Sequence, residues 1–228
     1  MVNKIRLVIA TRESESDFFK KTATGRSLSI YRAPFIEVRL FPNNTRGLPS
    51  QYNIAISESN DDPAILVFIH DDVHILDYFW VGQILDALAQ FDLVGLAGNK
   101  RRVSKQPSWA FIDSNFTWDN RENLSGVVGH GNGFPPDNLS LFGPTKQEVK
   151  LLDGVMLIAD SVSLLRHDIK FDEQFDFHFY DLDFCRQIEK KGLKMGTWPI
   201  SVIHESGGNF GSKDWSLGYQ KYINKWKN

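Results

Sequence analysis

A run of five apolar residues that leads into two adjacent carboxylates constrains the fold of this chain more than any other feature. Residues 65–69 read Ile-Leu-Val-Phe-Ile and are followed by His70, Asp71 and Asp72. The run is too short for a core helix and is typical of a strand buried on both faces. Ligands of open α/β sheets bind beyond the carboxyl ends of the strands, so the two acids are predicted to lie at a site.

Two carboxylates at the end of a buried strand need compensation. They repel each other and lose hydration unless a cation or hydrogen-bond donors offset their charge. A divalent metal ion does so most directly, and we predict one beside Asp71 and Asp72. The alternative is that one acid caps a helix that begins near Ile75 while the other is solvated.

Around this strand, the pattern alternates between strands and helices. Strands are predicted over residues 5–10, 35–41 and 93–97, with helices from near Ser14, from near Ser50 and over residues 75–90. For the later part of the chain we predict two strand-like runs in 149–160, helices over 161–166 and 181–191, edge strands at 194–198 and 201–204, and a helix after Gly211. The alternation indicates an α/β fold with a mostly parallel central sheet flanked by helices.

Between residues 98 and 146 the composition shifts toward Gly, Pro, Asn and Ser, with aromatic residues at alternating positions. We interpret this segment as a small antiparallel elaboration, because fewer than fifty residues without disulfides would be marginal as a separate domain. The chain is therefore predicted to be one domain over residues 1–228, with halves at 1–97 and 98–228.

Charge and cysteine content exclude several classes of function. A formal net charge of −2 gives no general electrostatic reason to bind nucleic acid or a membrane surface. Cys185 is the one cysteine, so neither an intramolecular disulfide nor a cysteine-based zinc site is expected. The N-terminal residues lead directly into a strand-like run, so we expect no signal peptide or transmembrane segment and a cytoplasmic protein.

Polar residues follow the first two predicted strands. Thr11, Arg12 and Glu13 come after the first strand, and Asn44 and Arg46 after the second. Such groups can hydrogen-bond a nucleotide base and ribose, although all of them are also ordinary turn and capping residues.

Two further segments carry candidate groups. Asp181 and Asp183 open a helix, where acids also interact favourably with the helix dipole in any protein. His204 leaves a predicted strand into a Gly-rich loop, and it can be a metal ligand or a structural hydrogen-bond partner.

Taken together and in order, these segments resemble the family-two glycosyltransferases of the GT-A type, in particular their rhamnosyltransferase-like and StrF-like members. The resemblance covers nearly the whole chain. It is carried by residues 11–13, Gly47 to Ile56, His70 to Val73, Leu152 to Ile158, Tyr180 to Arg186, and His204. In the family the later acidic motif often reads Glu-Asp-x-Asp, whereas here Tyr180 replaces the Glu.

The resemblance implies a metal-dependent, inverting transfer of a sugar from a nucleotide-diphosphate donor to an acceptor hydroxyl. It implies that Asp72, with His204, holds Mn²⁺ or Mg²⁺ on the donor diphosphate, and that Asp181 is the general base with Asp183 orienting its surroundings. Donor contacts are assigned to Thr11, Arg12, Glu13, Asn44, Arg46, Asn53, Asp71, Asp153 and Gly154.

The partners implied are the nucleotide-sugar donor and a glycan, lipid-linked or protein acceptor. Trp109 and Trp118 are predicted to form an acceptor-side wall, because flat apolar rings suit sugar faces, with burial in the core as the equal alternative. Two other functions remain open. A sugar-nucleotide nucleotidyltransferase would need a Gly-rich phosphate loop that residues 11–13 lack, and a non-catalytic nucleotide- or carbohydrate-binding module would fit the loss of the Glu.

Overall fold

A computed structural model describes residues 4–208 and 210–227 of the chain. Its larger sheet has the strand order β2 (Ile36–Phe41), β1 (Ile5–Ala10), β3 (Ile65–Ile69), β11 (Met156–Asp160), β5 (Leu93–Gly95), β12 (Met195–Thr197) and β9 (Glu148–Val149). Strands β2, β1 and β3 are mutually parallel, and so are β5 and β12. Strand β11 runs antiparallel between β3 and β5. The predicted α/β fold with a mostly parallel sheet is confirmed, with β11 and β9 as the reversed strands.

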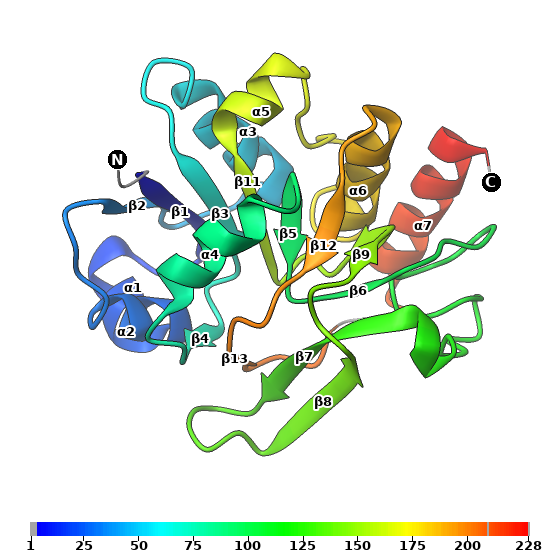
Figure 1. Cartoon of the computed structure of the whole chain (residues 1–228), viewed down its shortest axis with the longest axis horizontal. Helices are drawn as coiled ribbons and strands as arrows, with labels where there is room; N and C mark the ends of the chain where they lie inside the picture. Colours follow the sequence, from blue (N-terminus) through cyan, green and yellow to red (C-terminus); the bar gives the residue numbers. More distant parts are fainter. Residues whose placement is uncertain (1–3, 209, 228) are drawn as a thin grey trace.

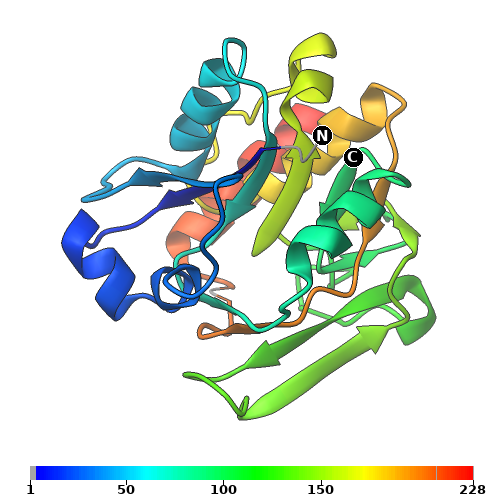
Figure 2. The same ribbon diagram turned by 60° about the vertical axis from the view of Figure 1, so that its left-hand side comes forward.

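Strands β1 and β3 occupy the interior of this sheet and form the centre of the core. Every residue of both strands is buried, as expected for mainly apolar strands covered on two faces, and the one charged residue, Arg6 of β1, pairs with Glu37 and Asp62. Helix α3 (Leu48–Glu58) packs on β1, and α4 (Trp80–Leu88) packs on β5 and β11. Figures 1 and 2 show α4 on one face of the sheet and α3 on the other.

A smaller sheet lies beside the first. Its order is β10 (Leu151–Leu152), β6 (Ala97–Asn99), β7 (Leu124–His130), β13 (Val202–His204) and β4 (Val73–Ile75), with β8 (Asn138–Gly143) paired to β7. The antiparallel pair β7 and β8 projects below the main sheet in Figure 1 and confirms the predicted antiparallel elaboration. Because the chain passes directly from β3 to β4 and from β5 to β6, the two sheets share a junction.

The remaining helices are α1 (Glu15–Lys21), α2 (Ala23–Leu28), α5 (Ser161–Arg166), α6 (Tyr180–Lys190) and α7 (Lys213–Trp226), with a 3-10 turn at Arg121–Asn123. Ser14 caps α1 through its side chain, as its position before two acids predicted. Gly192 follows α6 with a φ of 74°, a conformation that glycine adopts without strain. Among the described residues, no helix is both long and apolar enough to cross a bilayer.

Three details of the predicted elements were wrong. Residues 73–75 form strand β4, so the helix expected from Ile75 begins only at Trp80. The segment 93–97 is split between β5 and β6, which belong to different sheets. Strands β12 and β13 are not edge strands, because β12 lies between β5 and β9, and β13 lies between β7 and β4.

Candidate active site

A cavity of about 1510 Å³ lies at the carboxyl ends of β1, β2 and β3, between the main sheet and the β7–β8 pair. It exceeds the roughly 300–1,000 Å³ typical of a pocket for one small ligand. The cavity can therefore take two substrates or one extended one. Its lining includes polar groups that follow these strands, at the edge of the sheet where ligands of open α/β sheets bind.

The junction of the two sheets brings His70, Asp72 and His204 together. Strand β3 ends at Ile69, the chain turns through residues 70–72, and β4 starts at Val73 in the smaller sheet. Strand β13 pairs antiparallel with β4 so that His204 lies opposite Val73, and the Glu205 amide donates to the Asp72 carbonyl at 2.9 Å. Two distant segments are thus fixed side by side by backbone hydrogen bonds.

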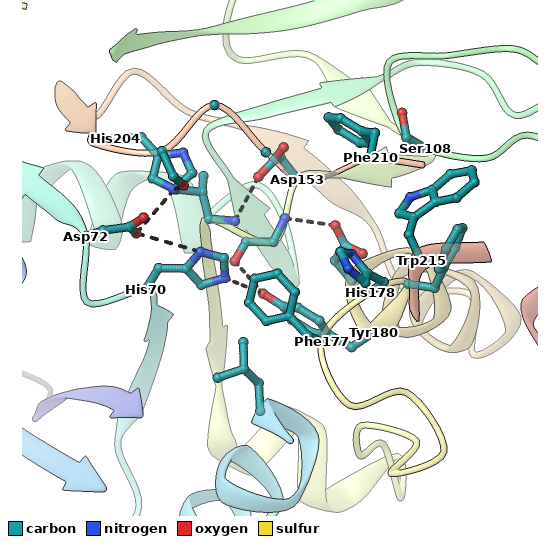
Figure 3. A pocket seen from close by; sticks show the side chains of 18 of the residues that line it. His70, Asp72, Ser108, Asp153, Phe177, His178, Tyr180, His204, Phe210 and Trp215 are labelled. Atoms are coloured by element: carbon teal, nitrogen blue, oxygen red, sulfur yellow. Dashed lines mark hydrogen bonds and ion pairs between the residues drawn. The ribbon is translucent and has the colours of Figure 1, made fainter. Parts of the chain in front are cut away.

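The three side chains form a compact ligand set. One ligand atom from each of His70, Asp72 and His204 lies within 4.8 Å of the others. Figure 3 shows the imidazoles of His70 and His204 turned toward the Asp72 carboxylate. His204 Nε2 is 3.2 Å from Asp72 Oδ1, and His70 Nδ1 is 4.0 Å from the same oxygen.

Asp72 Oδ1 is buried and accepts no hydrogen bond of regular geometry, although His204 is close. Such an oxygen loses hydration without full compensation, which a cation would supply. A carboxylate and two imidazoles are donors that bind divalent transition metals well. The residues present therefore fit a divalent cation.

The electrostatics of the site favour the cation-binding forms of Asp72 and His70, whereas His204 must lose a proton before it can bind a cation. Burial favours the protonated form of Asp72, but His204 and His70 outweigh it and lower the pKa of Asp72 to about 2. Burial lowers the pKa of His70, so its imidazole is neutral at neutral pH. Burial also opposes charge on His204, but the adjacent Asp72 raises the pKa of His204 above its usual value.

Asp71 has a different environment from its neighbour. Its Oδ2 accepts a hydrogen bond of 2.6 Å from Thr11 Oγ1, at the end of β1. Burial and then the charge of Asp72 raise the pKa of Asp71, which the Thr11 hydrogen bond only partly offsets. The backbone of the turn is held by Thr24 of α2, whose hydroxyl donates to the His70 carbonyl at 2.6 Å. Sequence reasoning missed Thr24 because nothing local links α2 to this turn.

A second acidic group lies across the cavity, where the chain between β10 and β11 meets the start of α6. The Asp181 carboxylate accepts from the Gly154 amide at 3.0 Å and from the Leu182 amide at 2.8 Å. Asp153 accepts from the Trp109 indole and from the Val155 amide. Burial, followed by the negative charge of Asp153, raises the pKa of Asp181 to about 7.

The backbone before α6 turns Asp181 toward the cavity. Phe179 is buried and has a φ of 70°, an uncommon conformation for a residue other than glycine. Backbone strain of this kind concentrates at functional sites. Gly154 is needed here because a Cβ at this position would lie 2.4 Å from the Tyr180 hydroxyl.

Most of the residues assigned to the donor line the same cavity. Thr11 is buried, Arg12 and Arg46 are exposed, and Glu13 and Asn44 are half-buried. Asn44 Oδ1 accepts from Gln51 Nε2 at 3.0 Å, which fixes the loop after β2. Apart from histidines, the exposed guanidinium groups of Arg12 and Arg46 are the basic side chains of the cavity wall among the described residues.

Two of the predicted site residues lie outside the cavity. Asn53 faces the other side of α3 and hydrogen-bonds the Phe171 backbone and Glu173. Asp183 is fully buried between α6 and α7, where it accepts from Trp226 Nε1 at 2.9 Å and pairs with Lys225 at 2.6 Å. The predicted contact of Asn53 with the donor and the predicted orienting role of Asp183 in the catalytic site are therefore corrected, since both side chains serve packing between elements.

The two tryptophans have different environments. Trp109 is buried, packs edge-on against Phe142, and donates its indole N–H to Asp153. Trp118 is 55% exposed at the mouth of the cavity and stacks on Phe142. Trp109 thus belongs to the core beneath the site, whereas Trp118 presents a free ring surface.

Several cavity residues were not singled out from the sequence. His70 was read as part of the strand end, yet it belongs to the ligand set and stacks on Phe177 at 5.8 Å between ring centroids. His130 ends β7 next to His204, and its buried Nδ1 has no hydrogen-bond partner. The sequence around His130 gave no indication of its role, because its position next to His204 depends on the parallel pairing of β7 with β13.

Comparisons with known proteins agree with this geometry. A family model described as "Glycosyltransferase like family" matches residues 9–207. No curated protein matches the sequence. The crystal structure of GalNAc-T7 with UDP, GalNAc and Mn²⁺ superposes with a TM-score of 0.57 at 12% identity, over 98% of this chain and 48% of that one. This chain therefore spans about half the length of that protein.

A second solved structure is similar in fold. The catalytic domain of Drosophila beta1,4-galactosyltransferase 7, in complex with xylobiose, superposes with a TM-score of 0.51 at 10% identity. The match covers 95% of this chain and 79% of that one. At these identities the two likenesses establish a common fold.

Proposed function

Because the chain belongs to the glycosyltransferase-like family and has a GT-A-type fold, we propose that it transfers a sugar from a nucleotide-diphosphate donor to an acceptor hydroxyl with inversion. The proposal assigns metal binding to His70, Asp72 and His204. It assigns the general base to Asp181. The observation that carries it is the convergence of these three ligands, from both sheets, at one wall of a large cavity.

The ligand set gives the cation a specific role. A divalent ion bound there would neutralise negative charge that develops on a departing diphosphate. With two imidazoles and one carboxylate, the set favours Mn²⁺ over Mg²⁺, because Mg²⁺ prefers oxygen ligands in proteins. The structure of GalNAc-T7 was solved with UDP and Mn²⁺, which is consistent with this choice for a protein of the same fold.

Residues of the chain would hold the donor on the side of β1 and β2. Arg12 and Arg46 offer guanidinium groups to phosphate oxygens, a pairing with favourable geometry and charge. Thr11, Glu13 and Asn44 offer hydrogen-bonding groups to the nucleoside. Asp71 faces the same loops, and Asp153 and Gly154 would contact the donor sugar.

Asp181 has the properties that a general base needs near neutral pH. A base is most effective when its pKa is close to the working pH, and the pKa of Asp181 is about 7. Its two backbone hydrogen bonds fix the orientation of the carboxylate. In the proposed reaction Asp181 takes the proton of the acceptor hydroxyl as the new glycosidic bond forms.

The proposal is tested by metal-dependent binding followed by turnover. UDP-, GDP- and dTDP-sugars are screened by thermal unfolding with and without Mn²⁺. A ligand at about 100 times its Kd should add about 2.7 kcal/mol, which raises the Tm by roughly 5–10 °C for a chain of this size. Nucleoside diphosphate release and product formation are then measured with the donor that stabilises.

Two variants and one matched control make the test specific. Asp72→Ala and His204→Gln should fold and lose Mn²⁺-dependent stabilisation. His167→Gln, which alters a histidine at the end of α5 remote from the cavity, should keep it. Retention of Mn²⁺-dependent binding in a folded Asp72→Ala protein would refute the metal assignment. Tight donor binding without turnover for any acceptor would favour a non-catalytic binding module.

A further inference from the structure

Tyr180 occupies the position at which family-two glycosyltransferases often have a Glu. Its hydroxyl lies between the proposed metal ligands and Asp181. The side chain is 3% exposed and starts α6. Its hydroxyl is 2.8 Å from the Gly154 carbonyl and 2.9 Å from His70 Nε2. Figure 3 shows the ring of Tyr180 directed at His70 from the side opposite Asp72.

The arrangement of donors and acceptors around this hydroxyl fixes where the protons are. A carbonyl oxygen can only accept, so the single Tyr180 O–H proton is donated to Gly154. The Tyr180 oxygen must then accept from its second partner, His70 Nε2. Neutral imidazole carries one N–H, so a proton on Nε2 leaves Nδ1 with a free lone pair. His70 Nδ1 is the ring nitrogen that faces Asp72.

In the alternative tautomer, His70 could not bind a cation through Nδ1. With its proton on Nδ1, His70 would point an N–H toward the Asp72 carboxylate, whose Oδ1 lies 4.0 Å away. That contact is attractive, so Asp72 alone would favour a tautomer that cannot bind a cation. Tyr180 opposes the Nδ1–H tautomer, because its single proton cannot serve both the Gly154 carbonyl and an unprotonated His70 Nε2. The Tyr180 oxygen would then face one of these two acceptors without a proton between them.

We propose that Tyr180 is a positioning residue that holds His70 in the Nε2–H tautomer, so that its Nδ1 lone pair stays open to a divalent cation. The inference rests on the proposed function, in which His70 is a ligand. Hydrogen-bonding partners of this kind orient metal-binding histidines in many proteins, and their loss weakens metal affinity about 10–100-fold.

The Tyr180 hydroxyl also links the proposed metal ligands to Asp181, the proposed base. Gly154 accepts from Tyr180 through its carbonyl and donates to the Asp181 carboxylate through its amide. Tyr180, in place of the family's Glu, therefore connects His70 to Asp181 through hydrogen bonds to Gly154. A glutamate there would instead place a third carboxylate near Asp153 and Asp181.

Tyr52 provides a matched control. It is fully buried in the same aromatic cluster, with its ring centroid 6.0 Å from that of Tyr180. Its hydroxyl makes no hydrogen bond of regular geometry, although it lies close to the Tyr180 hydroxyl. Tyr52→Phe and Tyr180→Phe each remove one buried hydroxyl, but only Tyr180→Phe removes the bond to His70.

The test combines a spectroscopic readout with metal binding. Long-range proton–nitrogen correlation spectra of ¹⁵N-histidine-labelled, metal-free protein report the tautomer of each imidazole at about pH 8, where ordinary histidines are neutral. The His70 signals are assigned by their absence in His70→Gln. Calorimetric titration with Mn²⁺ alone then gives the Kd of each folded variant.

We expect His70 to be protonated on Nε2 in the unaltered protein. Tyr180→Phe should shift it toward Nδ1–H and weaken Mn²⁺ binding about 10–100-fold, while Tyr52→Phe changes neither. A proton on His70 Nδ1 in the unaltered protein, or unchanged tautomer and Kd in Tyr180→Phe, overturns the positioning role. Absence of Mn²⁺ binding by the unaltered protein instead overturns the proposed function, so the two failures are distinct.

Discussion

Replacing Asp181 by Asn separates a catalytic base from an acid that merely stabilises a helix N-terminus. Asn keeps the volume of the side chain and one acceptor oxygen, but it cannot take a proton from an acceptor hydroxyl. Loss of general-base assistance lowers rates by roughly 10²–10⁴. We expect turnover to fall by that factor, while the affinities for Mn²⁺ and donor stay within about twofold.

The stability of the same variant should change in a direction that the helix-dipole role does not predict. The pKa of Asp181 is raised from 3.8 to about 7, so the folded state binds the proton more tightly than the unfolded state. Stability contributed by this group is therefore present at low pH and lost as the pH rises from about 4 to about 7. The full difference corresponds to roughly 4 kcal/mol of destabilisation at pH 8.

Asn removes this cost but loses one charge-assisted hydrogen bond from a backbone amide, worth about 1.5–3 kcal/mol. Because the Asn amide nitrogen would also face one of the two backbone amides, the two effects nearly cancel at a single pH, and the informative quantity is the change in Tm with pH. The Tm of the unaltered protein should fall relative to that of Asp181→Asn as the pH rises from about 4 to about 8. An acid that only favours its helix N-terminus would instead lose about 0.3–1 kcal/mol when neutralised. The sign of the change in Tm with pH decides between them.

The rate of transfer should follow the same ionisation. With a pKa of about 7, roughly a tenth of Asp181 is ionised at about pH 6 and roughly nine tenths at about pH 8. The kcat/KM of the unaltered protein should rise accordingly and then level off, whereas the residual rate of Asp181→Asn should lack this dependence. A fully active Asp181→Asn protein with an unchanged pH profile would refute the assignment.

Two further predictions concern residues whose environments differ from expectation. Trp118→Ala should raise the KM for the acceptor by about tenfold and lower the Tm by only a few degrees, because the ring packs on Phe111 and Phe142 but is 55% exposed; unchanged acceptor kinetics would exclude a role in the acceptor wall. Asp183→Asn should lower stability by about 1–3 kcal/mol, since it loses the ion pair with Lys225 inside the α6–α7 contact, and should leave turnover within about twofold; measuring Tm and transfer rate on one preparation checks both parts.

The sequence predicted the buried strands best. The bounds of β1 and β3 match the predicted runs because short segments that are wholly or mainly apolar have one favourable environment, the interior of a sheet. Strand β4 was missed because its three residues, Val-His-Ile, are too few for any periodicity to distinguish strand from helix. Its pairing partner, β13, lies more than a hundred residues away.

The residues of the candidate site, too, could be predicted only where the local sequence determines their position. Asp72 and Asp181 could be chosen from local patterns, since each stands directly at the end of a predicted element. Asp183 shows where such reasoning fails, although helix geometry already contained the answer. Residues two apart on a helix do not share a face, so Asp181 and Asp183 cannot both point into one cavity. His70 could not be recognised as a ligand from the sequence, because its proximity to His204 depends on the pairing of β13 with β4.

The adjacent acids Asp71 and Asp72 lie in different environments, and this difference reduces their mutual repulsion. Asp71 is held by the Thr11 hydroxyl, and burial with the charge of its neighbour raises its pKa. Asp72 lies against two imidazoles, and its pKa falls to about 2. Environments that push the pKa values of two neighbouring acids apart assign them different tasks. We therefore propose Asp72 as the acid that stays ionised to bind a cation, whereas Asp71 connects the turn to the loop after β1, where the donor nucleotide is proposed to bind.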